Sequence, residues 1–466
     1  MAVLIIPLTL YLLIFLYNNQ IWYGKETKSR TLTQMKMTCE VQGLGTSKQG
    51  YLQGSLGNTV VDEARASSMA LLQGARDGRE REEAKRRFGG FQWVNDNVTF
   101  VYAGYNDNKD GLPVVRVIAM IRKDIKHKFT CMLEYHNGKT VRTIGVQQCN
   151  SYPRNTKKRI YCNGYVICPR PLRAGEPSFL SVHKYGDISS RNNITVWYPR
   201  KKQNNITRCC KPFGNNYSNL TQLIWNIELS RIFGIDKFIF YLCSQSNDAV
   251  RILQEYEAEG IVELRNFTLP ASPIQNYTQG YVHWSQISTL HDCRLSQIGT
   301  AKYVIYHDFD EIVVPRKHKS LVDLADELMN KSTDGQEATG ALLFRNVYYP
   351  LFANRTTVDF PLKQHALRYD IHPLLYVTRK KASRVTRSPK SMIIPDAVEE
   401  MSVHYVRQFR PGYQTQVVKQ SLANLHHYRN PKQEHTTDSV SQDLFLHQYA
   451  HVLAGAVLNR CRNKAC

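Results

Sequence analysis

Continuous apolar strands alternate with helices in the second half of the chain, and this alternation most constrains its fold. Residues 237–243 (KFIFYLC) and 301–309 (AKYVIYHDF) are predominantly apolar and lack the alternation of a half-buried strand. Residues 219–234 space apolar residues three and four apart, and 249–260 and 281–299 are two further predicted helices that end in Gly. Strands that are apolar on both faces need helices on both sides of their sheet. We therefore expect a doubly wound, mostly parallel α/β sheet.

Three carboxylates follow the second of these strands, in the segment YHDFDEIVVP. They are Asp308, Asp310 and Glu311. Parallel sheets bind ligands at the carboxyl ends of their strands, which is where this cluster is expected. Two carboxylates this close repel each other, so the site needs a cation or a shifted pKa. A divalent ion such as Mg²⁺ or Mn²⁺ bridges carboxylates to substrate phosphates. The alternative is a cap or an ion pair with Arg or Lys, and we favour the metal–phosphate interpretation.

The composition indicates a globular protein with a basic surface. The chain has 466 residues, of which 42% are hydrophobic, and a net charge of +22. Its lysines and arginines are scattered, and no nucleic-acid-binding motif is present. We therefore expect no nucleic-acid partner.

The region from 201 to 430 is expected to hold the α/β domain, and 431–466 is expected to be a C-terminal extension. In this extension, Cys461 and Cys466 could pair with each other, with cysteines of the preceding domains or with another chain.

The N-terminal 24 residues carry no charged side chain and are expected to form a transmembrane signal-anchor. Trp22 and Tyr23 are suited to the membrane interface. A cleaved signal peptide is the rival interpretation, but no small-x-small cleavage site follows the apolar run. Residues 25–90 are rich in polar and charged residues and are expected to form a stem.

Cysteines and glycosylation sequons both favour a lumenal body. The chain has 11 cysteines, and none forms a paired CxxC array with zinc spacing, so disulfides in an oxidising compartment are expected. A β-rich subdomain is predicted over 91–200, where short β-prone runs are separated by turns and four cysteines are available to staple it. The sequons of the form Asn-x-Ser/Thr begin at Asn97, Asn193, Asn205, Asn216, Asn219, Asn266, Asn276, Asn330 and Asn354.

Several segments together resemble glycosyltransferase family 92, whose members are expected to have the GT-A fold. The resemblance covers roughly 95–430. It is carried by FVYAGYNDNKDGLPVVRVIAMI, NLTQLIWNIELSRIFGIDKFIFY, WSQISTLHDCRLSQIGTAKYVIYHDFDEIVVP and MIIPDAVEEMSVHYV. It implies a nucleotide-sugar-dependent enzyme that inverts the configuration of the transferred sugar.

The resemblance also implies roles for individual residues. Asp308 would contact the nucleotide-sugar or the metal, and Asp310 would ligate Mn²⁺, which bridges the two phosphates of UDP. His404 would be the second protein ligand of the metal, because imidazole with carboxylate suits Mn²⁺. Glu311 would orient its neighbours. An inverting enzyme needs a general base that deprotonates the acceptor hydroxyl. Asp359 and Asp370 both lie in candidate acceptor loops after the carboxylate cluster, a structural role is the alternative for each, and we predict Asp370.

Four further positions are weighed for the donor nucleotide. Pro212 and Phe213 end the predicted strand 209–213, where the uridine would bind, and a turn Pro with a core Phe is the equally favoured alternative. Arg294 and Asp292 precede the metal strand, and an intra-helix or capping role is an equal alternative for both. Lys390 is expected to be solvated and is assigned no role.

The leading hypothesis is therefore an inverting, Mn²⁺-dependent hexosyltransferase. It would transfer galactose from UDP-galactose to glycans on glycoproteins, as a single-pass type II protein of the Golgi membrane with a lumenal catalytic domain. The alternative is a catalytically silent lumenal protein of the same fold that binds glycans or partner chains. A glycoside hydrolase is disfavoured, because carboxylates two residues apart do not straddle a glycosidic bond.

Overall fold

The computed structural model describes most of the chain from residue 90 onward. The described residues are 90–109, 111–123, 128–149, 161–189, 192–199, 201, 203–214, 216–269, 281–329, 337–384, 387–430, 440–462 and 466. The expected signal-anchor (1–24) lies outside them, as does the expected stem (25–90) except for its last residue. No helix of the described part is long and apolar enough to span a membrane.

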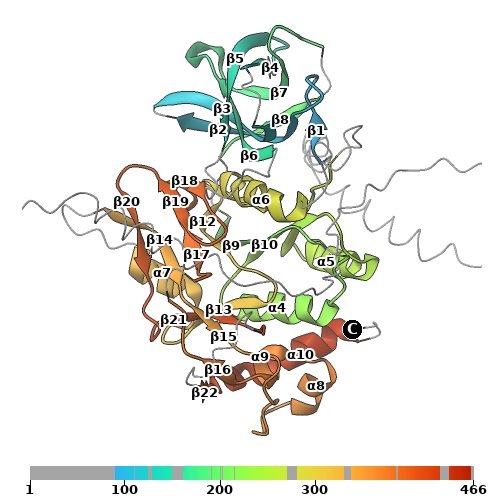
Figure 1. Ribbon diagram of the computed structural model, residues 1–466, viewed down its shortest axis with the longest axis vertical. Helices are drawn as coiled ribbons and strands as arrows, with labels where there is room; N and C mark the ends of the chain where they lie inside the picture. The colour runs from blue at the N-terminus through green and yellow to red at the C-terminus, as the bar shows by residue number, and fades with distance from the viewer. Residues whose placement is uncertain are drawn as a thin grey trace, which may run out of the picture. The chain divides into compact units, whose positions relative to one another are not determined.

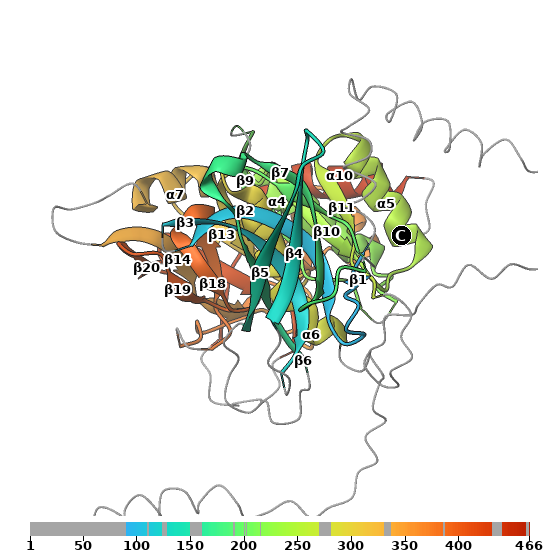
Figure 2. The ribbon, with the colours of Figure 1, turned by 90° about the horizontal axis from the view of Figure 1, so that it is seen from above.

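Strands β2 to β8 form a closed β-barrel, because the last strand pairs back with the first. The strand order is β1-β2-β3-β6-β5-β4-β7-β8, and β8 also pairs in parallel with β2 (Figures 1 and 2). Disulfides Cys131–Cys168 and Cys149–Cys162 cross-link it, as the four cysteines indicated. The strands are β1 Gln92–Trp93, β2 Phe100–Lys109, β3 Leu112–Arg122, β4 Lys128–Tyr135, β5 Thr140–Cys149, β6 Tyr161–Pro169, β7 Pro177–Lys184 and β8 Ile194–Trp197.

The second large sheet is the predicted α/β sheet. Its strand order is β11-β10-β9-β12-β17-β14-β20. The first four of these strands run parallel, and β17 runs antiparallel to its two neighbours. The two apolar strands are confirmed, as are the three expected helices, of which one precedes the first strand and two lie between the strands. The strands are β9 Asn204–Cys209, β10 Lys237–Leu242, β11 Val262–Asn266, β12 Ala301–Tyr306, β14 Ala338–Phe344, β17 Lys390–Ile393 and β20 Tyr413–Val417.

The sheet is buried on both faces, as its apolar strands predicted. Tyr303 and Ile305 of β12 belong to one core, with residues of α4 (Leu220–Ile232) and α5 (Asn247–Ala258). The intervening Val304 and Tyr306 belong to another core, with residues of α6 (Tyr281–Gln297). Helix α4 begins where the Asn219 side chain accepts a hydrogen bond from the Gln222 amide (2.9 Å), which satisfies one of the free N–H groups at a helix start.

The strand expected over 209–213 lies earlier in the chain. β9 ends at Cys209, where the predicted strand begins. A strand between two neighbours needs its backbone N–H groups for both ladders, and Pro212 has none. The strand therefore consists of residues 204–209 (NNITRC) and ends at Cys209, the first of two consecutive cysteines.

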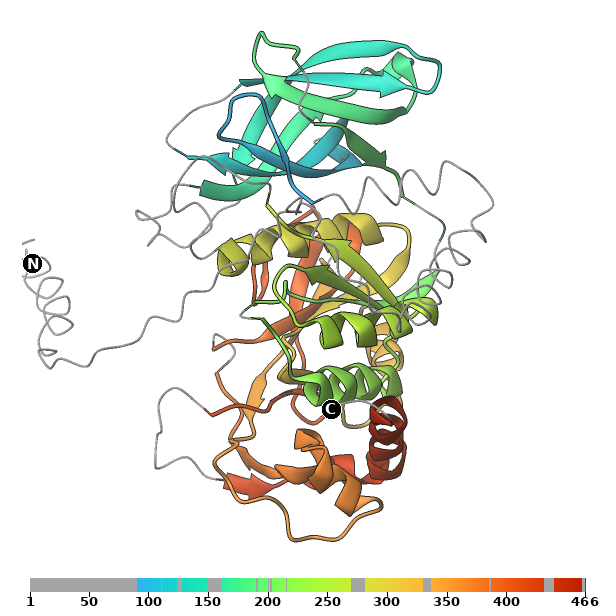
Figure 3. The same cartoon turned by 90° about the vertical axis from the view of Figure 1, so that its right-hand side faces the viewer.

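Helix α6 lies between the barrel and the sheet (Figures 1 and 3) and contacts strands of both. Many of the contacts are buried and polar. The Tyr105 hydroxyl of β2 donates a 2.5 Å hydrogen bond to Asp292 of α6. Arg265 of β11 forms an ion pair with the same carboxylate, and both side chains are almost fully buried (0% and 1% exposed). Asp292 is therefore an interior group that joins barrel, helix and sheet.

A smaller three-stranded sheet completes the α/β part. Strand β13 (Glu311–Pro315) is antiparallel to β21 (Ala423–His427), which is parallel to β15 (Asn346–Tyr348). This sheet begins directly after the carboxylate turn. The remaining elements are α7 Leu321–Met329, α8 Lys363–Arg368, α9 His372–Leu375, β16 Thr378–Lys380, β18 Val398–Met401, β19 Val406–Phe409 and β22 Val440–Gln442, with short 3₁₀ turns at Leu172–Ala174, Pro395–Ala397 and Phe445–Tyr449.

The C-terminal helix α10 (Ala450–Cys461) packs against α4 (Figure 3) and shares its hydrophobic core. Arg460 fixes its end. The guanidinium lies 4.0 Å from the centre of the Tyr256 ring and pairs through two nitrogens with Glu259 of the α5 end, at 2.6 Å each. Cys461 and Cys466 form a local disulfide, one of the three pairings left open by the sequence.

Replacing Arg460 with Ala is expected to lower the free energy of unfolding by about 1–2 kcal/mol, because a two-pronged ion pair and a cation–π contact are lost together. Urea denaturation of the purified protein measures the change. Arg251→Ala is the matched control, since Arg251 pairs with Asp248 on the exposed surface of α5. Equal effects of the two substitutions would show that Arg460 does not anchor α10.

Candidate functional site

The carboxylate turn lies at the switch point of the parallel sheet. β9 has β10 on one side and β12 on the other, so the chain leaves neighbouring strand ends in opposite directions. Sheets of this kind bind ligands in the crevice at that point. A hollow is present there, between the ends of β9, β12 and β17 and one side of α6. It is lined by Cys209, Lys211, Gln286, Leu290, Tyr306, His307, Asp308, Lys390 and Val403.

The three carboxylates occupy a tight turn between β12 and β13. The Glu311 amide donates to the Asp308 carbonyl oxygen (3.2 Å), and the Asp308 amide donates to the Glu311 carboxylate (2.9 Å). Arg208 stabilises the turn by donating a hydrogen bond to the Asp308 carbonyl oxygen at 3.2 Å. The carboxylates of Asp308 and Asp310 remain 23% and 24% exposed, whereas Glu311 is buried. Two carboxylates therefore stay accessible to a ligand.

Lys390 is a buried member of this site, which corrects the expectation that it is solvated. Its side chain is 2% exposed, and Nζ lies 2.9 Å from Asp308 Oδ2 and 3.0 Å from Glu311 Oε2. The reason is its position at the start of β17, beside β12 in the sheet interior. Burial alone lowers the pKa of Lys390, but Asp308 and Glu311 outweigh it and raise the pKa above its usual value.

Lys211 approaches Asp308 from the end of β9. Its Nζ lies 3.3 Å from Asp308 Oδ1, and the lysine side chain is partly exposed. Burial alone raises the pKa of Asp308, but Lys211 and then Lys390 hold it well below its usual value. Asp308 is therefore an anion with a lysine at each oxygen.

His427 also belongs to the site and was not identified from the sequence. Its Nε2 lies 3.2 Å from Asp310 Oδ2, and its Nδ1 lies 3.5 Å from Glu311 Oε1. The antiparallel register of β13 and β21 places His427 directly opposite Glu311. Burial alone raises the pKa of Asp310, and hydrogen bonding to His427 then lowers it below its usual value.

His404, the histidine expected from the family resemblance, lies beside the cluster without touching its carboxylates. It sits in the bend between β18 and β19, and its Nδ1 lies 3.2 Å from the Pro389 carbonyl oxygen. Burial lowers the pKa of His404, as does the charge of Lys390, while Asp308 acts in the opposite direction. The charges of Lys390 and Asp308 therefore both act on the His404 imidazole.

The residues predicted to bind the donor nucleotide are interior groups here. Phe213 is 1% exposed and stacks against Phe309, with ring centres 4.9 Å apart. Pro212 is buried beside it. Arg294 is fully buried and donates to the backbone oxygens of Pro395 and Glu399. These contacts match the alternatives of a core Phe and a structural helix residue.

Asp370, the predicted general base, is paired away from the carboxylate turn. Its Oδ1 lies 2.7 Å from Arg355 Nη2 and its Oδ2 lies 3.0 Å from His372 Nε2. Its backbone is left-handed, with φ of 46°, between α8 and α9. Within the described part of the chain, no hydrogen bond or ion pair joins Asp370 to Asp308, Asp310 or Glu311.

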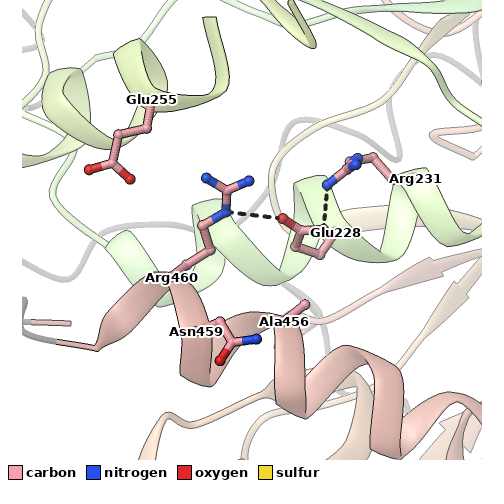
Figure 4. A pocket seen from close by; sticks show the side chains of 6 residues that line it. All are labelled: Glu228, Arg231, Glu255, Ala456, Asn459 and Arg460. Carbon is pink, nitrogen blue, oxygen red and sulfur yellow. Dashed lines mark hydrogen bonds and ion pairs between the residues drawn. The ribbon is translucent and has the colours of Figure 1, made fainter. Parts of the chain in front are cut away.

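A larger pocket lies elsewhere, between α4, α5 and α10 (Figure 4). It is lined by Glu228, Arg231, Glu255, Ala456, Asn459 and Arg460. Three of its charged groups pair with one another, since Arg231 Nη1 and Arg460 Nε lie 2.9 and 3.5 Å from the Glu228 carboxylate. This pocket surrounds the anchor of α10, and the switch-point crevice is the better candidate for chemistry.

The donor set at the turn suits a divalent ion. Asp308 and Asp310 offer carboxylate oxygens, and His427 offers an imidazole nitrogen beside Asp310. Such mixed oxygen and nitrogen ligands are suited to Mn²⁺. Among the described residues, no three His, Cys, Asp or Glu side chains already converge on one metal position. Both oxygens of Asp308 face lysines, so a bound ion would also rely on oxygens from its nucleotide.

The sequence of this α/β domain identifies the protein as a glycosyltransferase. The chain belongs to glycosyltransferase family 92, whose sequence model matches residues 204–451. Over 354 residues it is 24% identical to a β-1,4-galactosyltransferase (galt-1) of Caenorhabditis elegans, covering 72% of this chain and 75% of that protein.

Two solved structures are more distant neighbours. One is glucosyl-3-phosphoglycerate synthase from Mycobacterium tuberculosis in complex with phosphoglyceric acid, with 13% identity and a TM-score of 0.23 over 56% of this chain and 81% of that chain. The other is a mycobacterial protein with 16% identity and a TM-score of 0.22 over 56% of this chain and 76% of that chain. TM-scores this low do not establish a shared fold.

Proposed function

We propose that the protein is an inverting, Mn²⁺-dependent glycosyltransferase of GT-A type. It transfers a hexose, specifically galactose, from a UDP-sugar to a glycan acceptor on glycoproteins. The observation that carries the proposal is the accessible pair Asp308 and Asp310 at the switch point of the family domain. The galactosyltransferase named above, as a relative over most of this chain, supports the choice of sugar.

Different residues at the turn have different roles in binding the donor. Asp310 and His427, with Asp308, are the groups that we propose hold the divalent ion, and His404 stays a predicted ligand. When bound, the ion supplies positive charge to the departing diphosphate. Lys211, which is partly exposed, is positioned to bind an anionic group beside Asp308. Glu311 is buried and orients Lys390 and His427 through its two oxygens.

The reaction also needs a group that activates the acceptor hydroxyl. Inversion requires a base on the face of the sugar opposite UDP. Asp370 remains our prediction for this base, and its ion pairs with Arg355 and His372 imply that it would have to exchange partners. Disulfides in the described residues support a lumenal location, and we propose a type II Golgi membrane protein.

The proposal is tested with the purified full-length protein, a panel of UDP-hexoses and glycan acceptors, with and without Mn²⁺. We expect UDP release and product with UDP-galactose and Mn²⁺, and NMR of the product should show an inverted anomeric configuration. Retention of configuration, or equal turnover in EDTA, would contradict the mechanism.

The alternative is a silent binding protein of the same fold, and nucleotide binding separates the two. An active enzyme binds UDP in the presence of Mn²⁺, whereas a protein that only binds glycans has no need to. Absence of both UDP binding and turnover would favour this alternative.

A further inference from the structure

The charges around the carboxylate turn are already balanced by the protein itself. Among the described residues, three carboxylates lie close to three Lys or Arg side chains there, and the His427 imidazole also contacts Asp310 and Glu311. The acids are Asp308, Asp310 and Glu311, and the bases are Arg208, Lys211 and Lys390. A site with no excess negative charge attracts a divalent ion weakly, because the cations already present repel it.

Lys390 has the most direct effect on a metal ion. Its ammonium contacts Asp308 at 2.9 Å and Glu311 at 3.0 Å, and the side chain is only 2% exposed, so water screens its charge little. An ion that binds Asp308 therefore approaches a fixed positive charge. Lys211 contacts the other oxygen of Asp308 but is partly exposed, so water screens its charge more.

A nucleoside diphosphate changes this balance. It adds negative charge between the lysines and the ion, so each of the two ligands is attracted by the other. We propose that Lys390 makes divalent-metal binding depend on the nucleotide: its ammonium balances the charge of Asp308 and Glu311 without a metal ion, and the ion binds strongly only together with the diphosphate. This inference rests on the proposed function.

The experiment is a titration of Mn²⁺ into the full-length protein, followed by the electron paramagnetic resonance signal of free Mn²⁺, with and without UDP. For the wild type, we expect UDP to tighten Mn²⁺ binding by about tenfold or more. Lys390→Met should bind Mn²⁺ alone about tenfold more tightly than the wild type, and UDP should then add less. A merely structural lysine would not produce a gain in metal affinity.

Three further variants control the test. Lys390→Arg keeps the charge and should behave as the wild type toward Mn²⁺. Lys211→Met should shift Mn²⁺ affinity in the same direction as Lys390→Met but less, and it tests the electrostatic argument even where Lys390→Met fails to fold. Lys302→Met removes a lysine that pairs with Asp326 away from the turn, and it should leave Mn²⁺ affinity unchanged.

The outcomes separate this inference from the proposed function. Wild-type protein that binds Mn²⁺ equally well with and without UDP overturns the role of Lys390 and leaves the proposed function intact. Unchanged or weaker Mn²⁺ binding in folded Lys390→Met and in Lys211→Met overturns it as well. Wild-type protein that binds neither UDP nor Mn²⁺ under any condition overturns both.

Discussion

Asp310→Asn is expected to lower kcat/KM for UDP-galactose by about a thousandfold, or roughly 4 kcal/mol of transition-state stabilisation. Asp310 is the exposed carboxylate that His427 contacts, and neutralising it removes a charged oxygen ligand without changing the shape of the side chain. Steady-state release of UDP in Mn²⁺ measures the loss.

Asp248→Asn is the matched control for this prediction. Asp248 is an exposed carboxylate of α5 that pairs with Arg251, and its replacement should leave kcat/KM within about twofold. If Asp310→Asn retains more than a tenth of the wild-type activity, the carboxylate turn does not hold the metal that the reaction needs.

Arg265→Met should destabilise the protein by about 3–5 kcal/mol, the cost of leaving a buried charge without its partner. Among the described residues, the hydroxyl groups of Tyr105 and Tyr241 would then remain as hydrogen-bond partners of Asp292 (2.5 and 2.6 Å). The free energy of unfolding from urea titration measures the effect.

The double variant Arg265→Met with Asp292→Asn serves as the internal comparison. Because it removes both charges, it should recover a large part of the stability lost in the single variant. A loss below about 1 kcal/mol in Arg265→Met alone would show that this buried pair does not stabilise the junction of barrel, α6 and sheet.

Local patterns predicted the elements of the α/β sheet and the position of its carboxylate turn. The strand KFIFYL is apolar after its first residue, without alternation, which is typical of a sheet that is covered on both faces. The sequence order of strands and helices then placed Asp308 and Asp310 at a carboxyl end of the sheet. Closure of the barrel was not predicted, because it depends on pairing of β2 with β8, and no local pattern reports which distant strands pair.

The roles of Lys390 and His427 in the site were missed for the same reason. Lys390 reaches Asp308 across 82 positions of sequence, and His427 reaches Asp310 across 117. Sheet pairing and register bring both side chains to the turn. A weak signal was present, since Lys390 begins the short buried strand β17 and His427 ends the buried strand β21. The two interpretations of Phe213 could not be separated from the sequence, because an aromatic residue near a strand end is as suitable for the core as for a base.

The most direct measurement is a crystal structure of the protein soaked with UDP and Mn²⁺, with anomalous diffraction recorded at the manganese absorption edge. We expect an anomalous peak within ligand distance of Asp310, with the diphosphate of UDP between that peak and Lys211. A manganese peak and UDP bound together at another place, with the carboxylate turn unchanged, would contradict it.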